Sequence, residues 1–284
     1  MISVKIKTWW TSDYDIREIY NRMTRNNDYI WKDIYLTESD DYDFVVVQGS
    51  TEDAIDNNKC VVLQNEPFPY RLENYNKSFL QNDGFYKFVD IYHNMSLDNW
   101  ALNSTYRQIE HSNLNKPNTF SGLISEKSDL DGQVDRLNFA KNYLSDFVLY
   151  QPCSTTIIDD DHVHIDRPED AYIPYDYTFN AENTSEKNYF TEKIIRPILF
   201  ECVTFYSGCP NVEKFLHPDC YVVLDLKKPS ESLEIVTQCL LDKVHIRRKR
   251  VLSEQKRLLM NDNNTLNIIH NIIETGEIGW KTME

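Results

Sequence analysis

The most informative stretch of the chain, residues 175–200, reads YDYTFNAENTSEKNYFTEKIIRPILF. Its first residues predict a strand over Tyr175–Phe179, and a polar loop follows. A helix is predicted over Glu192–Glu201, with Thr191 placed to cap its first turn. The apolar face of this helix consists of Ile194, Ile195, Ile198, Leu199 and Cys202. Strand, loop and helix in this order indicate one unit of a parallel sheet that is covered by helices.

The same stretch carries polar groups where such a unit can bind an anion. The first turn of the predicted helix has free amide N–H groups and the positive end of the helix dipole, which suit a phosphate. Lys193 adds a full positive charge, and Glu192 can accept hydrogen bonds from ribose hydroxyls. From physical chemistry alone, an ordinary strand–helix unit with solvated charges is the simpler explanation, and the anion site stays open as the alternative.

More strands and helices are predicted on both sides of this unit. The predicted strands of the second half of the chain are Phe120–Ile124, Phe147–Tyr150, Cys202–Tyr206 and Tyr221–Asp225. Helices are predicted over Asp135–Leu144 and from Pro229 onward, where a proline and an acidic residue suit a first turn. In the first half, the predicted strands are Val4–Trp10, Tyr42–Val47 and Val61–Leu63, with a helix around Ile16 to Met23.

A polar, turn-rich segment, residues 111–118, separates the two patterns and is the predicted linker. The fold class is therefore α/β, with two Rossmann-like lobes, a ligand cleft between them and a C-terminal helical tail. The predicted domains are residues 1–112, the first lobe; residues 119–245, the second lobe; and residues 246–284, the helical tail.

Composition limits the function classes. The chain has 284 residues, with 30 Lys and Arg against 45 Asp and Glu, which gives a net charge of −15. Such an acidic chain repels phosphate backbones, so nucleic acid is not an expected partner. Hydrophobic residues make up 41% of the chain and aromatic residues 13%, which is typical of a folded globular protein and not of a disordered one.

Localisation is predicted from the cysteines and from the lack of targeting signals. The six cysteines are far apart and form no CxxC pair, which favours reduced thiols. No apolar run approaches the roughly 20 residues that a membrane span needs, and no signal peptide follows Met1. A cytoplasmic protein is therefore expected.

Several motifs resemble those of the α1,3-fucosyltransferases, which are inverting sugar-nucleotide transferases with the two-lobed GT-B architecture. The family signature has the form Tyr-Lys-Phe, apolar residues, Phe-Glu-Asn, a short loop and Tyr-Val-Thr-Glu-Lys. This chain has Tyr175-Asp176-Tyr177, Ala181-Glu182-Asn183 and Tyr189-Phe190-Thr191-Glu192-Lys193 at the same spacing. Downstream, Tyr206-Ser207-Gly208-Cys209-Pro210-Asn211 and Phe215-Leu216 resemble two further family elements.

Outside this core the resemblance is weaker but collinear, and it covers most of residues 1–245. Trp9-Trp10 resembles the end of the first strand in bacterial members, and Asp43-Phe44-Val45 resembles their second strand. Val62-Leu63-Gln64-Asn65-Glu66-Pro67 resembles the loop that carries the family's catalytic glutamate. Arg136 resembles the arginine of a helix behind a Ser-containing loop, here Leu123-Ile124-Ser125.

The resemblance implies that residues 1–112 form an acceptor-side lobe and residues 119–245 a nucleotide-sugar-binding lobe. It also implies a role for each of the matched residues. Arg136 and Lys193 would bind the donor diphosphate, because fixed cations stabilise the charge that develops on the leaving group. Asn183, Tyr189 and Glu192 would line the nucleotide pocket, and the remaining candidates for donor contacts are Ser125, Glu182 and Tyr150. Glu66 is the candidate general base for the acceptor hydroxyl.

Two other segments have competing interpretations. Asp159–Asp166 contains carboxylates and imidazoles that can hold a divalent cation, although a solvated loop is the simpler explanation and the resembled family needs no metal. The basic residues Arg247–Arg250, with Lys256 and Arg257, are expected on a helix that packs against the lobes. Peripheral membrane contact through this basic tail is the alternative.

The sequence therefore predicts a metal-independent inverting glycosyltransferase with no cofactor beyond its nucleotide sugar. GDP-fucose is the donor that the resemblance implies, and a glycan or glycoconjugate hydroxyl is the acceptor. The alternatives are a different nucleotide-sugar donor, a non-catalytic sugar- or nucleotide-binding protein on the same scaffold, and a metal-dependent hydrolase built on Asp159–Asp166.

Overall fold

The structure is a computed structural model that describes residues 1–112, 115–152 and 163–283. The chain forms two compact units. Unit 1 consists of Met1–Glu110, Lys187–Glu192 and Met260–Lys281, and unit 2 consists of His111–Glu186, Lys193–Leu259 and Thr282–Glu284. The residues that were expected to form a separate tail, 246–284, are thus divided between the two units.

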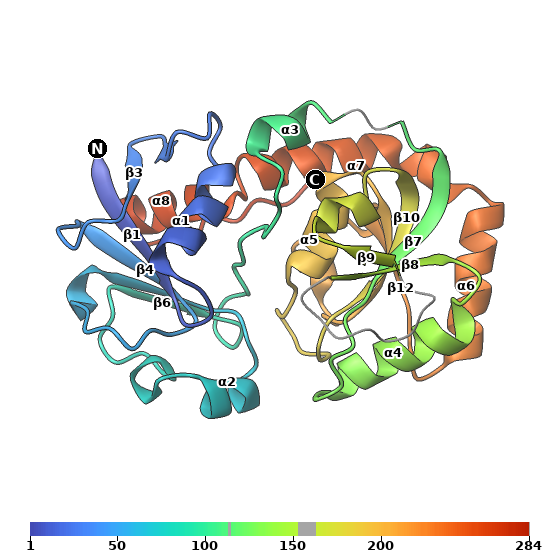
Figure 1. The fold of residues 1–284 in the computed structure, drawn as a ribbon, viewed down its shortest axis with the longest axis horizontal. Helices are drawn as coiled ribbons and strands as arrows, with labels where there is room; N and C mark the ends of the chain where they lie inside the picture. The colour runs from blue at the N-terminus through green and yellow to red at the C-terminus, as the bar shows by residue number, and fades with distance from the viewer. Residues whose placement is uncertain (113–114, 153–162, 284) are drawn as a thin grey trace. The chain divides into compact units, whose positions relative to one another are not determined.

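Unit 1 contains a six-stranded sheet in the order β2-β3-β1-β4-β5-β6 (Figure 1). Only the β2–β3 pair is antiparallel, and the other neighbours run parallel. The strands are β1 (Ile2–Thr8), β2 (Ile30–Trp31), β3 (Ile34–Thr37), β4 (Phe44–Gln48), β5 (Cys60–Gln64) and β6 (Lys87–Asp90). The middle strands are almost wholly buried, as expected for a parallel sheet with both faces covered.

The helices of unit 1 come from both ends of the chain. They are α1 (Asp13–Arg22), α2 (Phe68–Asn74), α3 (Tyr106–Glu110), α8 (Thr265–Thr275) and the 3-10 turns η1 (Asn57–Lys59) and η2 (Lys77–Phe79). Ser12 caps α1 by accepting a hydrogen bond from the Asp15 amide, and Asn264 caps α8 in the same way. Gly276 ends α8 with a left-handed backbone (φ +76°).

One face of the unit 1 sheet changes from apolar to charged along its width. Register places Lys5 beside Val45, and Val45 beside Cys60, so these side chains share a face. Toward β5 this face is an apolar core of Val45, Val47, Cys60, Val62, Phe79 and Phe85.

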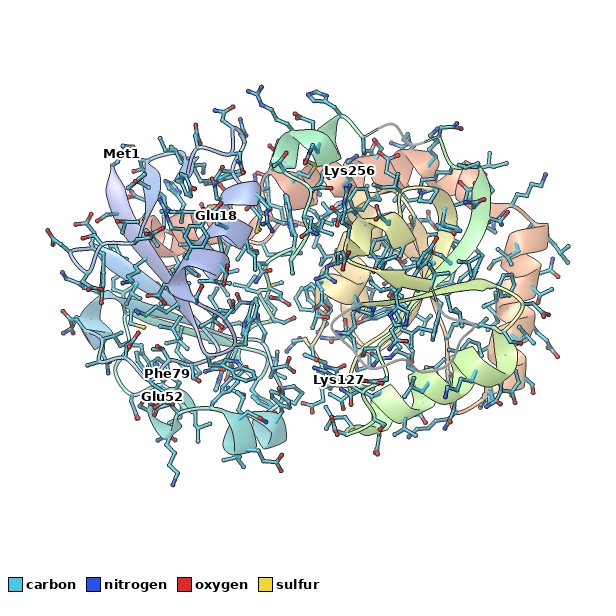
Figure 2. The ribbon with its side chains drawn as sticks, viewed as in Figure 1. Met1, Glu18, Glu52, Phe79, Lys127 and Lys256 are labelled. Atoms are coloured by element: carbon cyan, nitrogen blue, oxygen red, sulfur yellow. The ribbon has the colours of Figure 1, made fainter. Side chains whose placement is uncertain are left out.

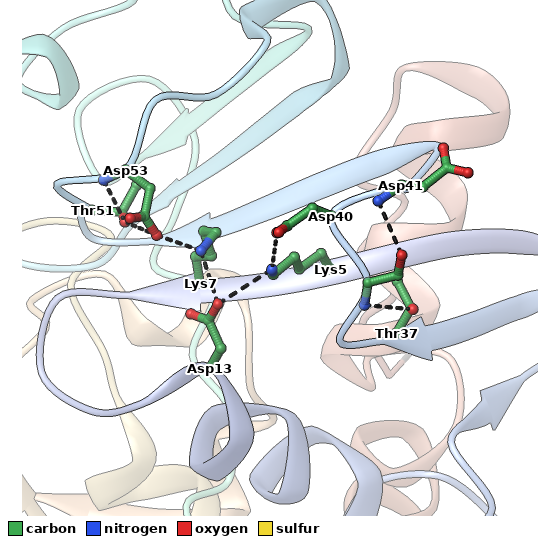
Figure 3. Close-up of polar contacts among 9 residues, drawn as sticks. Lys5, Lys7, Asp13, Thr37, Asp40, Asp41, Thr51 and Asp53 are labelled. Atoms are coloured by element: carbon green, nitrogen blue, oxygen red, sulfur yellow. Dashed lines mark hydrogen bonds and ion pairs between the residues drawn. The ribbon is translucent and has the colours of Figure 1, made fainter.

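On β1 the same face carries two buried lysines, Lys5 and Lys7 (Figure 3). The Lys7 ammonium pairs with Asp13 at 2.8 Å and also with Asp53, and Lys5 pairs with Asp40 at 2.6 Å. Burial lowers the pKa of Lys7, but the hydrogen bonds to its two carboxylates outweigh burial and leave the pKa raised. The aspartates thus compensate the charges that β1 buries.

Unit 2 contains a second six-stranded sheet, in which every strand pair is parallel and the order is β12-β11-β10-β7-β8-β9 (Figure 1). The strands are β7 (Asn118–Leu123), β8 (Val148–Pro152), β9 (Val163–Ile165), β10 (Tyr175–Ala181), β11 (Val203–Ser207) and β12 (Tyr221–Val223). β10 lies in the interior of the sheet, and all but one of its residues are buried.

The longer helices of this part of the chain are α4 (Asp131–Tyr143), α5 (Glu192–Leu199), α6 (Pro229–Leu241) and α7 (Val244–Met260), with the 3-10 turns η3 (Pro168–Ala171), η4 (Val212–Lys214) and η5 (Pro218–Cys220). The predicted apolar face of α5 is confirmed, because Ile194, Ile198 and Leu199 are fully buried. On α7, Lys256 (labelled in Figure 2) is also buried, with its ammonium 3.7 Å from the Glu201 carboxylate.

The strands and helices predicted from the sequence are present, with ends shifted by a few residues. The first strand ends at Thr8, so Trp9 and Trp10 lie beyond it, and the helix predicted over Asp135–Leu144 begins earlier, at Asp131. The sequence analysis did not predict β2, β3, β6, β9, α2 or α3. Among the described residues, no helix combines the length and apolar character needed to cross a bilayer.

Candidate functional site

The carboxyl end of β10 is where several of the predicted site residues of unit 2 meet. Asn180, Ala181 and Glu182 are all buried there. The amide of Glu182 donates to the carbonyl of Ser207 at 2.9 Å, which ties this end to the end of β11. Ligands of open parallel sheets bind beyond the carboxyl ends of the strands, so this is the expected edge for a site.

Arg136 projects from α4 to this strand end and is 2% exposed. Its Nη1 atom donates to the Ala181 carbonyl at 3.0 Å, and its Nη2 atom donates to the Ser125 hydroxyl at 3.1 Å. Two hydrogen bonds from one planar group fix its orientation. The structure therefore brings together Arg136 and Ser125, two of the residues predicted from the sequence.

Lys193 approaches the same strand end from the first turn of α5. Its ammonium lies 3.7 Å from the carboxylate of Glu182, and its side chain is 20% exposed. Glu182 also accepts a hydrogen bond from the buried Tyr206 hydroxyl at 3.2 Å. Burial, and then the Glu182 charge, raise the pKa of the Tyr206 hydroxyl well above its usual value, so that hydroxyl stays a donor. Arg136 and Lys193 thus hold consecutive residues, Ala181 and Glu182.

Two glycines allow this close packing. A Cβ atom on Gly208 would lie 2.4 Å from Glu182 Cγ and 2.7 Å from the Tyr206 hydroxyl. A Cβ atom on Gly132, in the first turn of α4, would lie 2.7 Å from the Asn183 carbonyl oxygen. Both positions exclude any larger residue unless the strand end moves, since real Cβ atoms do not approach so closely.

A cavity of about 520 Å³ opens beside this strand end in unit 2. Its wall is rich in carboxylates and includes Asp131, Asp135, Glu182, Glu213 and Asp225, with Lys227 as a cation. Arg136 and Lys193 contact Ala181 and Glu182, which line the cavity, but are not themselves among the lining residues. The wall is suited to hydrogen-bond donors such as ribose hydroxyls and base N–H groups.

In unit 1, two other predicted residues meet. The Tyr189 hydroxyl donates to Glu66 Oε2 at 3.2 Å, and Tyr189 is fully buried while Glu66 is half-buried. The backbone around Tyr189 is held by Ser96, whose amide donates to the Asn188 carbonyl at 3.0 Å and whose hydroxyl accepts from the Phe190 amide at 3.0 Å. The segment Lys187–Glu192 belongs to unit 1, although the sequence had placed Tyr189 in the second lobe.

The remaining predicted residues occupy different surroundings. Asn183 is half-buried directly after Glu182, and Glu192 is half-buried as the first residue of α5. The Tyr150 hydroxyl bonds to the hydroxyl of Tyr175 at 2.8 Å. Tyr175 is the first residue of β10 and Ala181 the last, so the Tyr150 hydroxyl is directed toward the opposite end of the strand from Arg136.

Sequence reasoning gave no role to Tyr206, Gly132 or Gly208. The motif Tyr206-Ser207-Gly208 was visible as part of the resemblance, and its tyrosine and glycine are the two residues that fit against Glu182. No motif pointed to Gly132. Glycine is needed there because the backbone of Asn183, far along the chain, lies too close for a Cβ atom.

Residues 159–162 of the proposed metal run lie outside the described part of the chain. Among the residues that the structure does describe, no three His, Cys, Asp or Glu side chains are grouped to hold a metal ion. The five described cysteines, Cys60, Cys202, Cys209, Cys220 and Cys239, are free thiols.

The basic segment of the tail lies on α7, which buries Val251, Leu252, Leu258 and Leu259. Within it, Arg248 donates to the Tyr221 carbonyl at 3.0 Å and Arg250 pairs with Glu254 at 2.6 Å. The predicted packing helix is confirmed, whereas membrane contact stays a prediction.

Among the comparisons with known proteins, only the comparison of structures found similar proteins. No protein-family model matches the sequence. No curated protein matches it either. A crystal structure of an α1,3-fucosyltransferase with GDP-fucose superposes with a TM-score of 0.50 at 15% identity, covering 87% of this chain and 81% of that one. Anabaena HepE, solved in complex with UDP and glucose, superposes with a TM-score of 0.50 at 8% identity, covering 97% of this chain and 99% of that one.

At such identities the likeness concerns the fold. The chain has the mixed α/β fold of two-lobed GT-B glycosyltransferases, with one parallel, Rossmann-like sheet in each lobe apart from the antiparallel edge pair β2–β3. The predicted fold class is therefore confirmed. The stronger resemblance predicted for the second lobe stays a prediction.

Proposed function

We propose that this protein is a glycosyltransferase that moves fucose, or a related deoxy sugar, from a nucleoside diphosphate to a hydroxyl of a glycan. The observation that carries the proposal is the convergence of Arg136 and Lys193 on the end of β10. The GT-B fold supports it, because an α1,3-fucosyltransferase and Anabaena HepE share that fold. We propose inversion at the anomeric carbon, in a single displacement.

In this reaction the departing diphosphate gains negative charge as the anomeric carbon becomes positive. Cations that are fixed before the reaction stabilise that transition state more than the ground state. Arg136 would offer its guanidinium to the diphosphate from a position set by Ala181 and Ser125. Lys193 would add a point charge, so we propose that these two side chains neutralise the leaving group without a metal cofactor.

Glu66 is the proposed general base. The acceptor hydroxyl must lose its proton as its oxygen attacks, and a carboxylate within hydrogen-bond reach can take that proton. The Tyr189 hydroxyl donates to one carboxylate oxygen, Oε2, and fixes the orientation of the group. The other oxygen, Oε1, is the one we propose for the acceptor.

GDP-fucose is the donor we propose first. Guanine presents N1–H and the N2 amino group side by side, and this pair of donors matches the two oxygens of a carboxylate. Uracil presents a single N–H between two carbonyl acceptors, which a carboxylate-rich wall repels. The cavity that contains Asp131, Asp135, Glu213 and Asp225 therefore favours guanine. A UDP-sugar is the second candidate, because HepE shares the fold and was solved with UDP and glucose.

Calorimetric titration with GDP and with UDP, both in the presence of EDTA, tests the proposal. We expect GDP to bind without metal, and more tightly than UDP. Tighter binding of UDP would identify a UDP-sugar, the second candidate, as the donor in place of GDP-fucose. Binding of neither nucleotide would overturn it. A transfer assay with GDP-fucose and a glycan acceptor then separates an enzyme from a non-catalytic binding protein, since only an enzyme releases GDP.

A further inference from the structure

Three aromatic rings gather at one edge of unit 1. Trp9 follows the end of β1, Tyr70 lies on α2, and Tyr75 follows α2. The Trp9 and Tyr75 rings are 5.6 Å apart, Trp9 and Tyr70 are 6.4 Å apart, and Tyr70 and Tyr75 meet edge to face at 6.3 Å. Each ring therefore contacts the other two, within the range of favourable aromatic pairs.

The arrangement of these rings is fixed by the backbone beneath them. The Trp9 indole N–H and the Tyr75 hydroxyl both lie against Gly49, and the indole N–H opposes the rise that burial causes in the pKa of that hydroxyl. A Cβ atom on Gly49 would lie 2.9 Å from Trp9 Cδ1 and 3.0 Å from the Tyr75 hydroxyl. Gly49 also has a φ of +84°, which side chains of L-residues rarely adopt. Glycine is therefore needed at position 49, because the side chains of Trp9 and Tyr75 pack directly against the backbone there.

The rings are not all buried. Tyr75 is 9% exposed and forms the base of the group, whereas Trp9 is 42% exposed and Tyr70 is half-buried. The next residue, Trp10, is 45% exposed as well. Two consecutive tryptophans that expose this much surface are unusual on a soluble protein and indicate a binding surface.

Glu66 belongs to the same edge. Trp9 and Gly49 come directly after β1 and β4, and Glu66 is the second residue after β5; these three strands are parallel neighbours whose carboxyl ends meet at one edge of the sheet. Besides burial, the charge of Glu66 raises the pKa of the Tyr75 hydroxyl, so the carboxylate lies close to the base of the aromatic group. An exposed aromatic surface therefore borders a half-buried carboxylate.

We infer that Trp9 and Tyr70 form a stacking surface for a pyranose ring, and that Glu66 accepts a hydrogen bond from a hydroxyl at the edge of that ring. A pyranose presents C–H bonds on its faces and hydroxyls around its rim. The negative face of an aromatic ring attracts those C–H groups, and a carboxylate accepts from the rim. The occupant is a cyclic sugar, and it is the acceptor if the proposed function holds.

Saturation-transfer NMR on the full chain tests this inference with three compounds. Lactose and cellobiose present pyranose faces, and sorbitol presents similar hydroxyls without a ring. We expect saturation of the ring C–H protons of at least one disaccharide and none of sorbitol. Equal saturation of sorbitol, or none of either disaccharide, overturns the inference.

Variants locate the surface. Trp9→Leu and Tyr70→Leu should each weaken disaccharide binding about tenfold, the size expected for one aromatic contact. Tyr70→Phe keeps the ring and should retain binding. Tyr35→Leu is the matched control, because Tyr35 is 36% exposed and lies on β3, paired in register with Ser3 and therefore far from the carboxyl edge. Unchanged binding in both leucine variants overturns the inference, and Tyr70→Leu alone decides it if Trp9→Leu does not fold.

The results of this test and of the nucleotide titration distinguish failure of the stacking surface from failure of the proposed function. GDP binding with no contribution from Trp9 or Tyr70 removes the stacking surface and leaves the proposed function. Disaccharide binding that depends on these rings, without binding of any nucleotide, removes the proposed function and leaves a sugar-binding surface in unit 1.

Discussion

The Tyr189 hydroxyl lies 3.2 Å from Glu66 Oε2, although 123 residues separate the two along the chain. The contact is internal to unit 1. The segment Lys187–Glu192 belongs to that unit, although the residues before and after it in the sequence belong to unit 2. A residue next to the predicted donor ligands Glu192 and Lys193 therefore orients the proposed general base. Changes in this short segment should therefore affect acceptor activation.

Glu66→Gln should lower kcat by about 10²- to 10⁴-fold, because the amide cannot accept the acceptor proton. Calorimetric binding of GDP should be unchanged, since Glu66 lies in unit 1 and the proposed diphosphate ligands lie in unit 2. Tyr189→Phe should cause a smaller loss of kcat, because it removes only the hydrogen bond that orients the carboxylate. Full turnover in Glu66→Gln would exclude this residue as the base.

Lys193→Met should lower the transfer rate by about 10²- to 10³-fold, the usual cost of losing one group that stabilises a developing charge. Lys141→Met is the control, since Lys141 is an exposed residue of α4. Arg136→Lys should also slow transfer, because lysine cannot replace both the Ala181 and the Ser125 hydrogen bonds. Single-turnover rates with saturating donor give the comparison, and a normal rate in Lys193→Met would contradict the mechanism.

Gly208→Ala should destabilise the fold by about 1–3 kcal/mol, as overpacking of a buried site does. The new methyl group would meet Glu182 Cγ at 2.4 Å, and both Glu182 and Tyr206 are buried. Urea unfolding measures the change, with Gly122→Ala for comparison, because the added methyl group there meets the end of the flexible Leu149 side chain. Equal stabilities for the two variants would show that the strand end can move away.

The charged cluster of β1 should make stability depend on pH. The hydrogen bond from Lys7 lowers the pKa of Asp53 below its ordinary value of 3.8, so this group contributes stability above pH 3.8 and loses it as the pH falls through the lowered pKa. The raised pKa of Lys7 acts in the opposite direction. Its contribution is complete below its ordinary value of 10.5 and is lost as the pH rises through the raised pKa.

In Lys7→Met, the free energy of unfolding should therefore fall less than in the wild type, both as the pH is lowered into the acid range and as it is raised into the alkaline range. Urea unfolding across the pH range checks this, with Lys141→Met as the exposed control. An unchanged pH dependence in Lys7→Met would show that the cluster of Lys7, Asp13 and Asp53 is energetically neutral.

The sequence predicted the central strands because their residues form uninterrupted apolar runs, as in Val45–Val47 and Val61–Leu63. It missed β6, since Lys87 and Asp90 at its ends are polar. Lys87 nevertheless suits its place, because its ammonium donates to the carbonyl of Gly276 at 2.6 Å. The hydrogen-bond partner of this strand end is distant in the sequence, so the residues near Lys87 contain no pattern that predicts a strand.

The site was predictable where a residue type implied its chemistry. Lys193 was found in this way, whereas Arg136 was predicted only through the family resemblance, and the structure brings both to the end of β10. What could not be predicted depends on contacts across the fold. The contact of Trp9 with Tyr70 joins the segment after β1 to α2, and no spacing rule links positions so far apart.

The position of α8 decides how the protein can be dissected. Its buried residues Ile268, Ile269 and Ile272 belong to unit 1, yet they are encoded almost at the end of the chain. A fragment that stops at Glu110 would leave bare the apolar surface that α8 covers, and would tend to aggregate. Adding back a synthetic peptide of residues 260–281 should rescue its solubility, in the manner of fragment complementation.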